Sequence, residues 1–186
     1  MKKRLYTKKL RAESEDATRQ RIVEALVELH EEIGPAQTTI SAVAERAGVQ
    51  RLTVYRHFPD EPSMIRACSA HWAQLNPLPD LAPSHDEPLR ACRTTLLRLY
   101  GWYRGNAGML TQITRDAERL PVVAEALAPF GEQLDRVAEQ LDRYWNERSS
   151  HRRATLRHAL EFSTWRSLDR ITGSDRRSVA IVAGWL

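Results

Sequence analysis

Apolar residues recur every three or four positions along almost the whole chain, and this spacing predicts helices rather than strands. The first predicted helix, residues 15–33, places four apolar residues on one face: Ile22, Leu26, Leu29 and Ile33. Gly34-Pro35 then predicts its end, because glycine favours a helix stop and proline cannot continue the hydrogen-bond ladder. The remaining predicted helices are residues 40–47, 50–57, 60–75, 89–104, 109–116, 122–145, 150–171 and 175–186. The pattern therefore predicts an all-α protein of about nine helices.

Two short predicted helices, residues 40–47 and 50–57, are joined at Gly48, and the residues around this glycine fit a helix-turn-helix. Ala44 is small enough to let the two helices cross closely, and Gly48 permits the left-handed conformation of a tight turn. Val49 and Val54 are expected to fill the space between the helices. Either Thr38 or Thr39 is expected to cap the first helix of the pair.

The second short helix combines an apolar side with six polar side chains: Gln50, Arg51, Thr53, Tyr55, Arg56 and His57. Glutamine and arginine can pair with adenine and guanine in the major groove, and threonine can contact a base or a thymine methyl. Tyrosine, histidine and arginine can donate hydrogen bonds to phosphates. These side chains would also suit a helix that simply faces solvent, but the helix-turn-helix spacing favours DNA.

The net charge of +4 is unevenly distributed. The first twelve residues contain no acid and six bases: Lys2, Lys3, Arg4, Lys8, Lys9 and Arg11. Such a basic arm suits a polyanionic partner, although a solvated tail would have the same composition. The charge pattern is thus compatible with a nucleic-acid partner.

The segment "TTISAVAERAGVQRLTVYRHFPDE", residues 38–61, resembles the DNA-binding signature of the tetracycline-repressor (TetR) family of bacterial regulators. The "YRHFP" run after "AGV" is its specific part, and a "TWRSL" run at residues 164–168 is a weaker likeness near the end of the chain. The resemblance implies residues 1–60 as a three-helix DNA-binding domain with its basic arm, and residues 61–186 as a helical ligand-binding and dimerisation domain. It further implies that Thr39, Tyr55 and His57 contact phosphates. Gln50 and Arg51 would open the recognition helix, and Thr53 would lie over the bases.

Three residues depart from this family's pattern. Leu52 stands where a small residue is usual, so the helix could dock differently or contact thymine methyls. Gln50 replaces a residue that caps helices well. Glu61, followed by Pro62, replaces a lysine, and its carboxylate is expected to repel phosphate beside a helix N-terminus.

The C-terminal part offers residues for an effector pocket and for a dimer interface. The pocket candidates are mostly aromatic: Trp72, Trp102, Tyr103, Met109, Gln112, Phe130 and Phe162. The interface candidates lie on apolar stripes of the last two predicted helices: Leu156, Leu160, Trp165, Val179, Val182 and Trp185. His158, Phe162 and Trp165 are expected on one helix face. Each of these stripes could equally be intramolecular core.

The resulting hypothesis is a ligand-responsive repressor that binds a near-palindromic DNA operator as a homodimer and is released by a small-molecule inducer. A metal-dependent helical-bundle enzyme is one alternative, supported only by His158 and Glu161 on one helix face. A DNA-organising protein without an effector is another. No catalytic, cofactor or metal motif is evident.

Cys68 and Cys92 are expected to be reduced core thiols. Without a signal peptide or a long apolar run, we expect a cytoplasmic protein.

Overall fold

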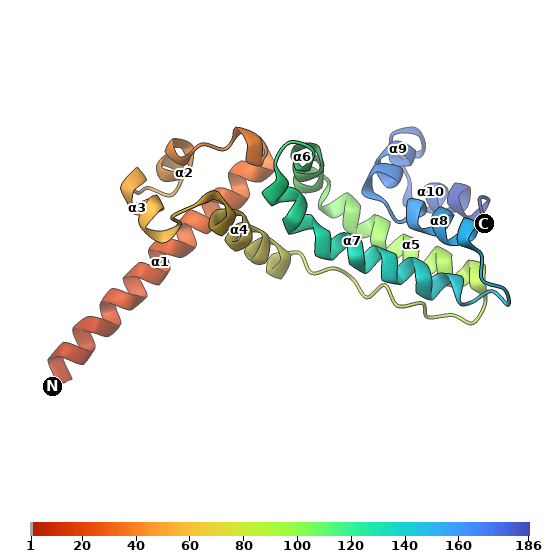
Figure 1. The fold of residues 1–186 in the computed structure, drawn as a ribbon, viewed down its shortest axis with the longest axis horizontal. Coiled ribbons are helices and arrows are strands. Elements are labelled where there is room, and N and C mark those ends of the chain that lie inside the picture. Colours follow the sequence, from red (N-terminus) through yellow and green to blue (C-terminus); the bar gives the residue numbers. More distant parts are fainter. Residues whose placement is uncertain (1) are drawn as a thin grey trace. The chain divides into compact units, whose positions relative to one another are not determined.

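The computed structural model describes the backbone of residues 2–186 and the side chains from Glu13 onward. Across this range the chain forms ten α-helices, one short 3-10 helix and no strand, which confirms the all-α prediction (Figure 1). The elements are α1 (Lys2–Glu32), η1 (Pro35–Gln37), α2 (Ile40–Arg46), α3 (Arg51–His57), α4 (Glu61–Leu75), α5 (Pro88–Gly105), α6 (Ala107–Ala117), α7 (Pro121–Asp142), α8 (Ser150–Ala159), α9 (Phe162–Thr172) and α10 (Asp175–Ala183).

The chain divides into two compact units. Unit 1 contains the chain up to Asn76 together with Thr111–Ala126, and unit 2 contains Pro77–Leu110 and Leu127–Leu186. The packing of unit 1 therefore includes α4 and most of α6 as well as the first three helices. The division of function at residue 60 stays a prediction.

The core of unit 1 lies where α1 packs against α2 and α4. Its fully or nearly buried residues are Ile22, Val23, Ala25, Leu26, Leu29, Val43, Ala44, Ala47, Val54, Phe58, Met64 and Cys68. The predicted apolar face of the first helix is thus confirmed, with Ile33 packed at its margin. The helix itself begins at Lys2 instead of residue 15, so the backbone of the basic arm is helical. The side chains of that arm lie outside the described residues.

Side chains of α6 bind the backbone where α1 ends and η1 begins. Gln112 Nε2 donates to Glu32 O at 3.2 Å, and Arg115 Nη2 donates to Ile33 O at 3.1 Å. The backbone N–H of Ala36 donates to Asp116 Oδ2 at 2.8 Å. Carbonyls at a helix C-terminus have no partner inside the helix, so α6 supplies the partners that α1 lacks. This contact fixes the turn between α1 and α2.

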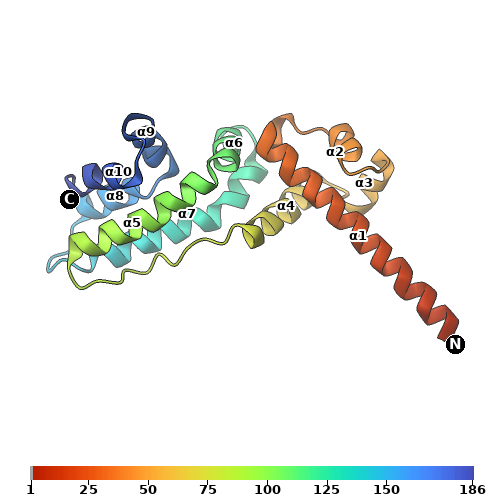
Figure 2. The same ribbon diagram turned by 180° about the vertical axis from the view of Figure 1, so that it is seen from behind.

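Unit 2 is a helical bundle in which α5 runs beside the later part of α7, as Figures 1 and 2 both show. The helix predicted over residues 150–171 is in fact two helices, because the chain is extended at Glu161. Tyr100 Oη donates to Ala159 O at 2.8 Å, and Tyr103 Oη donates to Leu160 O at 2.6 Å. These hydroxyls satisfy carbonyls at the end of α8, so the helix can stop there without glycine or proline.

The break after α8 overturns the prediction that His158, Phe162 and Trp165 share one helix face. His158 is exposed, whereas Phe162 and Trp165 are buried. Residues 77–87, between α4 and α5, form a loop, and this loop is held against the bundle. Leu81 is buried, and its carbonyl accepts a hydrogen bond from Thr95. Both cysteines are free and buried, as expected.

Candidate nucleic-acid interface

The first helix of the pair, α2, begins where the sequence predicts it. Thr39 has an extended backbone, and its Oγ1 accepts a hydrogen bond from the Ala42 N–H at 3.2 Å. This bond uses the hydroxyl oxygen as an acceptor, so the hydroxyl hydrogen remains able to donate. Thr39 is exposed, so its hydroxyl can still reach a phosphate while it caps α2.

The turn between α2 and α3 depends on Gly48. Its φ is +64°, in the left-handed region that other residues disfavour. The N–H of Val49 then bonds to Ala44 O at 2.9 Å, which closes the turn directly after α2. Ala44 is buried between the helices, and Val49 packs against the same core. The residues predicted to build the turn occupy the predicted places.

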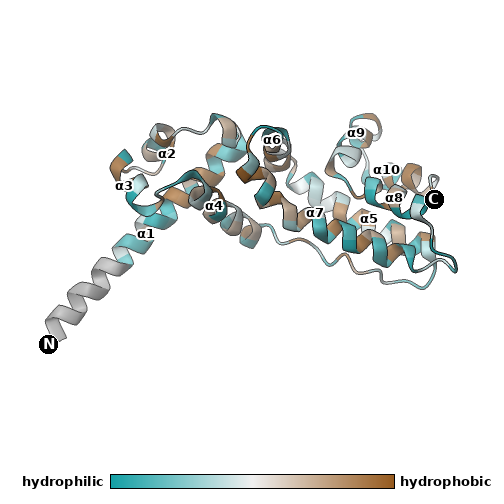
Figure 3. Cartoon of the chain, viewed as in Figure 1, coloured by the Kyte–Doolittle hydropathy of each residue, from teal (hydrophilic) through white to brown (hydrophobic). Residues whose placement is uncertain are grey.

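Helix α3 has one buried side and one open side. Figure 3 shows that the helix combines hydrophobic and hydrophilic residues. Val54 is fully buried, and Phe58 follows it into the core. Four of the polar candidates are exposed: Gln50, Arg51, Tyr55 and Arg56. Thr53 and His57 are half-buried at the edge of the open side. The sequence therefore folds into a rigid support that presents hydrogen-bond donors to solvent.

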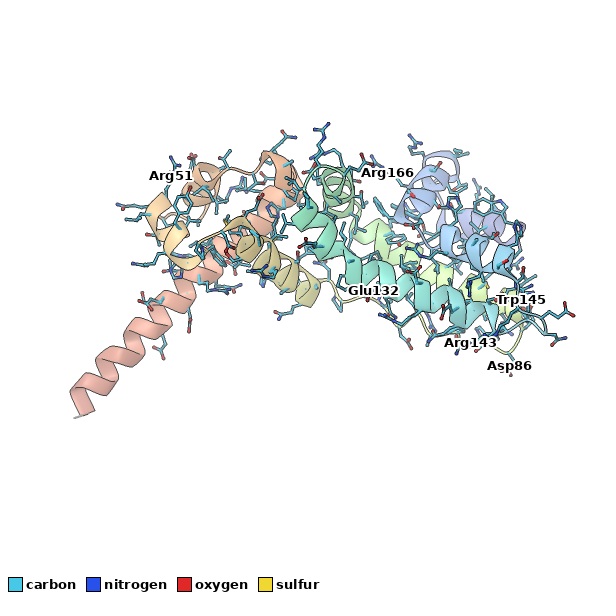
Figure 4. All side chains as sticks on the ribbon, viewed as in Figure 1. Arg51, Asp86, Glu132, Arg143, Trp145 and Arg166 are labelled. Carbon is cyan, nitrogen blue, oxygen red and sulfur yellow. The ribbon has the colours of Figure 1, made fainter. Side chains whose placement is uncertain are left out.

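The arginines near this face differ in whether they already form ion pairs within the protein. Arg51, labelled in Figure 4, and Arg56 form no ion pair among the described residues. Arg46 instead binds Glu32 at 2.8 Å and Glu28 at 3.0 Å, linking α2 to α1. An arginine that already holds two carboxylates is a poor phosphate ligand, so Arg51 and Arg56 are the better candidates.

His57 differs from the expected arrangement. Its Nε2 is buried and has no hydrogen-bond partner among the described residues. A phosphate at the surface would therefore have to accept its hydrogen bond from Nδ1. Gln50 forms no side-chain cap at the start of α3, so its amide remains available to a ligand.

Arg19 on α1 is an additional candidate that the sequence did not suggest. Its guanidinium lies 4.8 Å from the centre of the Phe58 ring, beside the end of α3. Because the guanidinium N–H groups point outward in the plane of the guanidinium, the contact with the Phe58 ring leaves them able to donate hydrogen bonds. Arg19 lies within a largely acidic segment of the sequence, so only its position against Phe58 identifies it as a candidate DNA contact.

The start of α4 carries negative charge at the edge of this surface. Asp60 caps the helix by accepting the Ser63 N–H at 2.7 Å, and hydrogen bonds from Ser63 hold the Asp60 pKa below its usual value. Glu61, the departure noted in the sequence, occupies the first turn of α4 and is exposed. The carboxylates of Asp60 and Glu61 both oppose a phosphate at this helix end.

Comparison with known proteins agrees with this geometry. Residues 22–68 match the family described as bacterial regulatory proteins, tetR family. The match to this family therefore covers the helix-turn-helix and parts of its flanking helices, α1 and α4. A curated relative, the HTH-type transcriptional regulator SrpR of Pseudomonas putida, is 38% identical over 77 residues. That match covers 40% of this chain and spans only 36% of the relative's length.

Solved structures extend the likeness beyond the helix-turn-helix. A candidate fatty acid metabolism regulator of Clostridium perfringens superimposes with a TM-score of 0.64 at 15% identity, covering 88% of this chain and 94% of that one. The multidrug binding protein EbrR, complexed with imidazole, gives a TM-score of 0.60 at 17% identity, covering 90% and 89%. At these identities the likeness shows that this chain shares its fold with both proteins.

The predicted pocket residues are only partly brought together. Trp102, Tyr103, Phe130 and Phe162 form one aromatic cluster in unit 2, with ring centres 5.3 to 6.4 Å apart. Met109 is also buried in unit 2, whereas Trp72 and Gln112 belong to unit 1. Burial raises the pKa of the Tyr103 hydroxyl well above its usual value. The use of these residues as an effector pocket stays a prediction.

Most of the predicted interface residues belong to the core of this chain, and their use as a dimer interface stays a prediction. Five of them are buried within this one chain: Leu156, Leu160, Trp165, Val179 and Val182. Leu156 lies on α8, Trp165 on α9, and Val179 and Val182 on α10; α10 packs against both α5 and α9. Trp185 is exposed and stacks on His158, with ring centres 6.2 Å apart. Trp185 is therefore the exposed residue among the six candidates.

Two further findings bear on the alternative of a metal-dependent enzyme. Among the described side chains, no group of three histidines, cysteines or carboxylates is placed to hold a metal ion. Glu161, half of the predicted ligand pair, binds Arg157 instead. Over the part of the chain that the structure describes, no helix has the length and apolar character to cross a membrane.

Proposed function

We propose that the chain is a ligand-responsive transcriptional regulator that binds a near-palindromic DNA operator as a homodimer and acts as a repressor. The observation that carries this proposal is the open side of α3. There, exposed hydrogen-bond donors stand on a helix whose other side is anchored in the core by Val54 and Phe58. The match of residues 22–68 to the tetR family of bacterial regulatory proteins supports the same function.

In this proposal α3 enters the major groove, and its residues divide into two groups. Gln50, Arg51 and Thr53, at the N-terminal end, contact base edges, because that end of a recognition helix reaches deepest into the groove. A second group binds phosphates and sets the register: Thr39, Tyr55, Arg56 and His57. In a homodimer the two α3 helices would lie about 34–36 Å apart or somewhat more, in successive major grooves.

A small-molecule effector would bind unit 2 and release the DNA. The aromatic cluster around Tyr103 supports an apolar ligand, and the similar protein EbrR is described as multidrug binding. The effector would change the tilt of α4, which packs on α1 beside the helix-turn-helix. Coupling of this kind is typically worth about 1–3 kcal/mol between two sites. We propose no catalytic role, no cofactor and a cytoplasmic location.

Selection of bound DNA from a random pool tests the proposal directly, since a regulator should enrich one near-palindromic sequence. Arg51→Ala is then expected to relax base preference at one position, and Tyr55→Ala to weaken binding to all sequences alike. Arg143→Ala is the matched control, because Arg143 is an exposed arginine of unit 2 (Figure 4). Failure of the wild type to enrich any sequence would overturn the proposal.

The effector and the dimer need separate measurements. A compound that binds should raise the melting temperature and release the selected DNA. If no compound in a broad pool does either, the DNA-organising alternative gains support. The mass in solution at micromolar concentration should be that of a dimer. A stoichiometric metal in the purified protein would favour the enzyme alternative.

A further inference from the structure

Leu52 is an apolar residue in the middle of a polar surface. It lies in the first turn of α3 and is 76% exposed, although moving a leucine side chain out of water is energetically favourable. Leu52 lies two positions before Val54, and Val54 is fully buried, so the two side chains point to opposite sides of the helix. No rearrangement that keeps Val54 in the core can bury Leu52.

The neighbours of Leu52 indicate the chemistry of the partner that this surface could bind. Tyr55 and Arg56 lie three and four positions later, which places them on the same helix face, and both are exposed. Arg51 precedes it, and its exposed guanidinium forms no ion pair with any side chain that the structure describes. Single exposed leucines are common on protein surfaces and need no explanation by themselves. This one is surrounded by side chains that suit a polyanion, and a polyanion with apolar groups at a groove floor is duplex DNA.

We propose that Leu52 contacts the C5 methyl group of a thymine in the major groove and thereby determines a base preference of this chain. The thymine methyl is the apolar group that the major groove presents, and an aliphatic side chain is its natural partner. The position in the first turn of α3 places Leu52 with the residues that face base edges. This inference rests on the proposed DNA-binding function.

The size of the effect follows from the area that one methyl group buries. Removing a buried methyl costs about as much as removing one methylene, which corresponds to roughly a fourfold loss of affinity. Arg51 contacts hydrogen-bonding groups instead, so its loss should not change the sensitivity to a methyl group. The loss of affinity on removing the thymine methyl should therefore require the Leu52 side chain. It should not require any other exposed leucine.

The test uses the full chain and the operator obtained by selection. Each thymine is replaced in turn by deoxyuridine, which lacks only the methyl group, and affinity is measured at fixed salt. For the wild type, at least one replacement should weaken binding about fourfold. With Leu52→Ala, the same replacement should have little further effect, and the selected sequence should lose its thymine preference there. Leu75→Ala, at an exposed leucine of α4, should behave like the wild type.

The outcomes separate this inference from the proposed function. If the wild type enriches no sequence, the proposed function fails, and the role of Leu52 fails with it. If the wild type binds its operator but no deoxyuridine replacement depends on Leu52, only the role of Leu52 is overturned. Equal loss in the wild type and in Leu52→Ala at every thymine also overturns that role alone, because another residue would then contact the methyl.

Discussion

His30 makes the stability of unit 1 depend on pH in a way that can be measured. The side chain is 4% exposed, and its Nδ1 lies 3.3 Å from the Sγ of Cys68, between α1 and α4. Burial lowers the pKa of His30 to about 4, although the charge of Asp116 works in the opposite direction. Burial also raises the pKa of the Cys68 thiol to about 12, so this partner stays protonated. Near neutral pH the pair is therefore uncharged.

The sign follows from comparing the folded and unfolded states. The unfolded chain binds a proton at His30 below an ordinary pKa of about 6.5, whereas the folded chain resists it until about 4. The contribution of neutral His30 to the free energy of unfolding is thus fully present above about pH 6.5. It is lost progressively as pH falls towards 4, because protons then favour the unfolded chain. One pKa unit corresponds to about 1.4 kcal/mol, so unit 1 should lose about 2 kcal/mol between about pH 7.5 and about pH 5 from this residue.

Hydrogen exchange of peptides from α1 and α4 can measure this change separately from the unfolding of unit 2, once intrinsic exchange rates are corrected for pH. His30→Leu removes the titrating group, so the variant should lose about 2 kcal/mol less than the wild type over the same range. The control His151→Leu replaces an exposed histidine of unit 2 and should keep the wild-type pH dependence of unit 1. Parallel pH curves for wild type and His30→Leu would show that His30 is not the group responsible.

Four further substitutions test the turns and the DNA-binding surface. In thermal unfolding, Gly34→Ala should destabilise unit 1 more than Gly48→Ala. Both positions have positive φ, at a cost of about 1–2 kcal/mol, but only at Gly34 would a Cβ meet buried Asp116 Oδ2, at 2.6 Å. Asp116→Ala should cost about 2 kcal/mol in the same assay, because the Ala36 N–H loses a charged acceptor; unchanged stability would contradict this. Glu61→Lys should tighten operator binding by removing a charge that repels phosphate, and equal affinity at fixed salt would count against it.

Local rules predicted the helix-turn-helix almost completely. The period of the apolar residues, the small Ala44 and the left-handed Gly48 act over fewer than ten residues, so the sequence contains all that the turn requires. The same rules failed at the boundary between α8 and α9. That boundary is set by Tyr100 and Tyr103, whose hydroxyls bind carbonyls 59 and 57 residues further along the chain. No pattern near residue 160 records those contacts.

The candidate site shows the same distinction. The residues of α3 alone establish which donors stand on its open side, because helix periodicity separates them from Val54 whatever the rest of the chain does. The sequence could not decide which apolar stripes are surface and which are core. Leu156 and Val182 are buried by neighbouring helices of their own chain, while Leu52 remains in solvent. Periodicity defines the faces of a helix, but only the packing of distant segments decides which faces are covered.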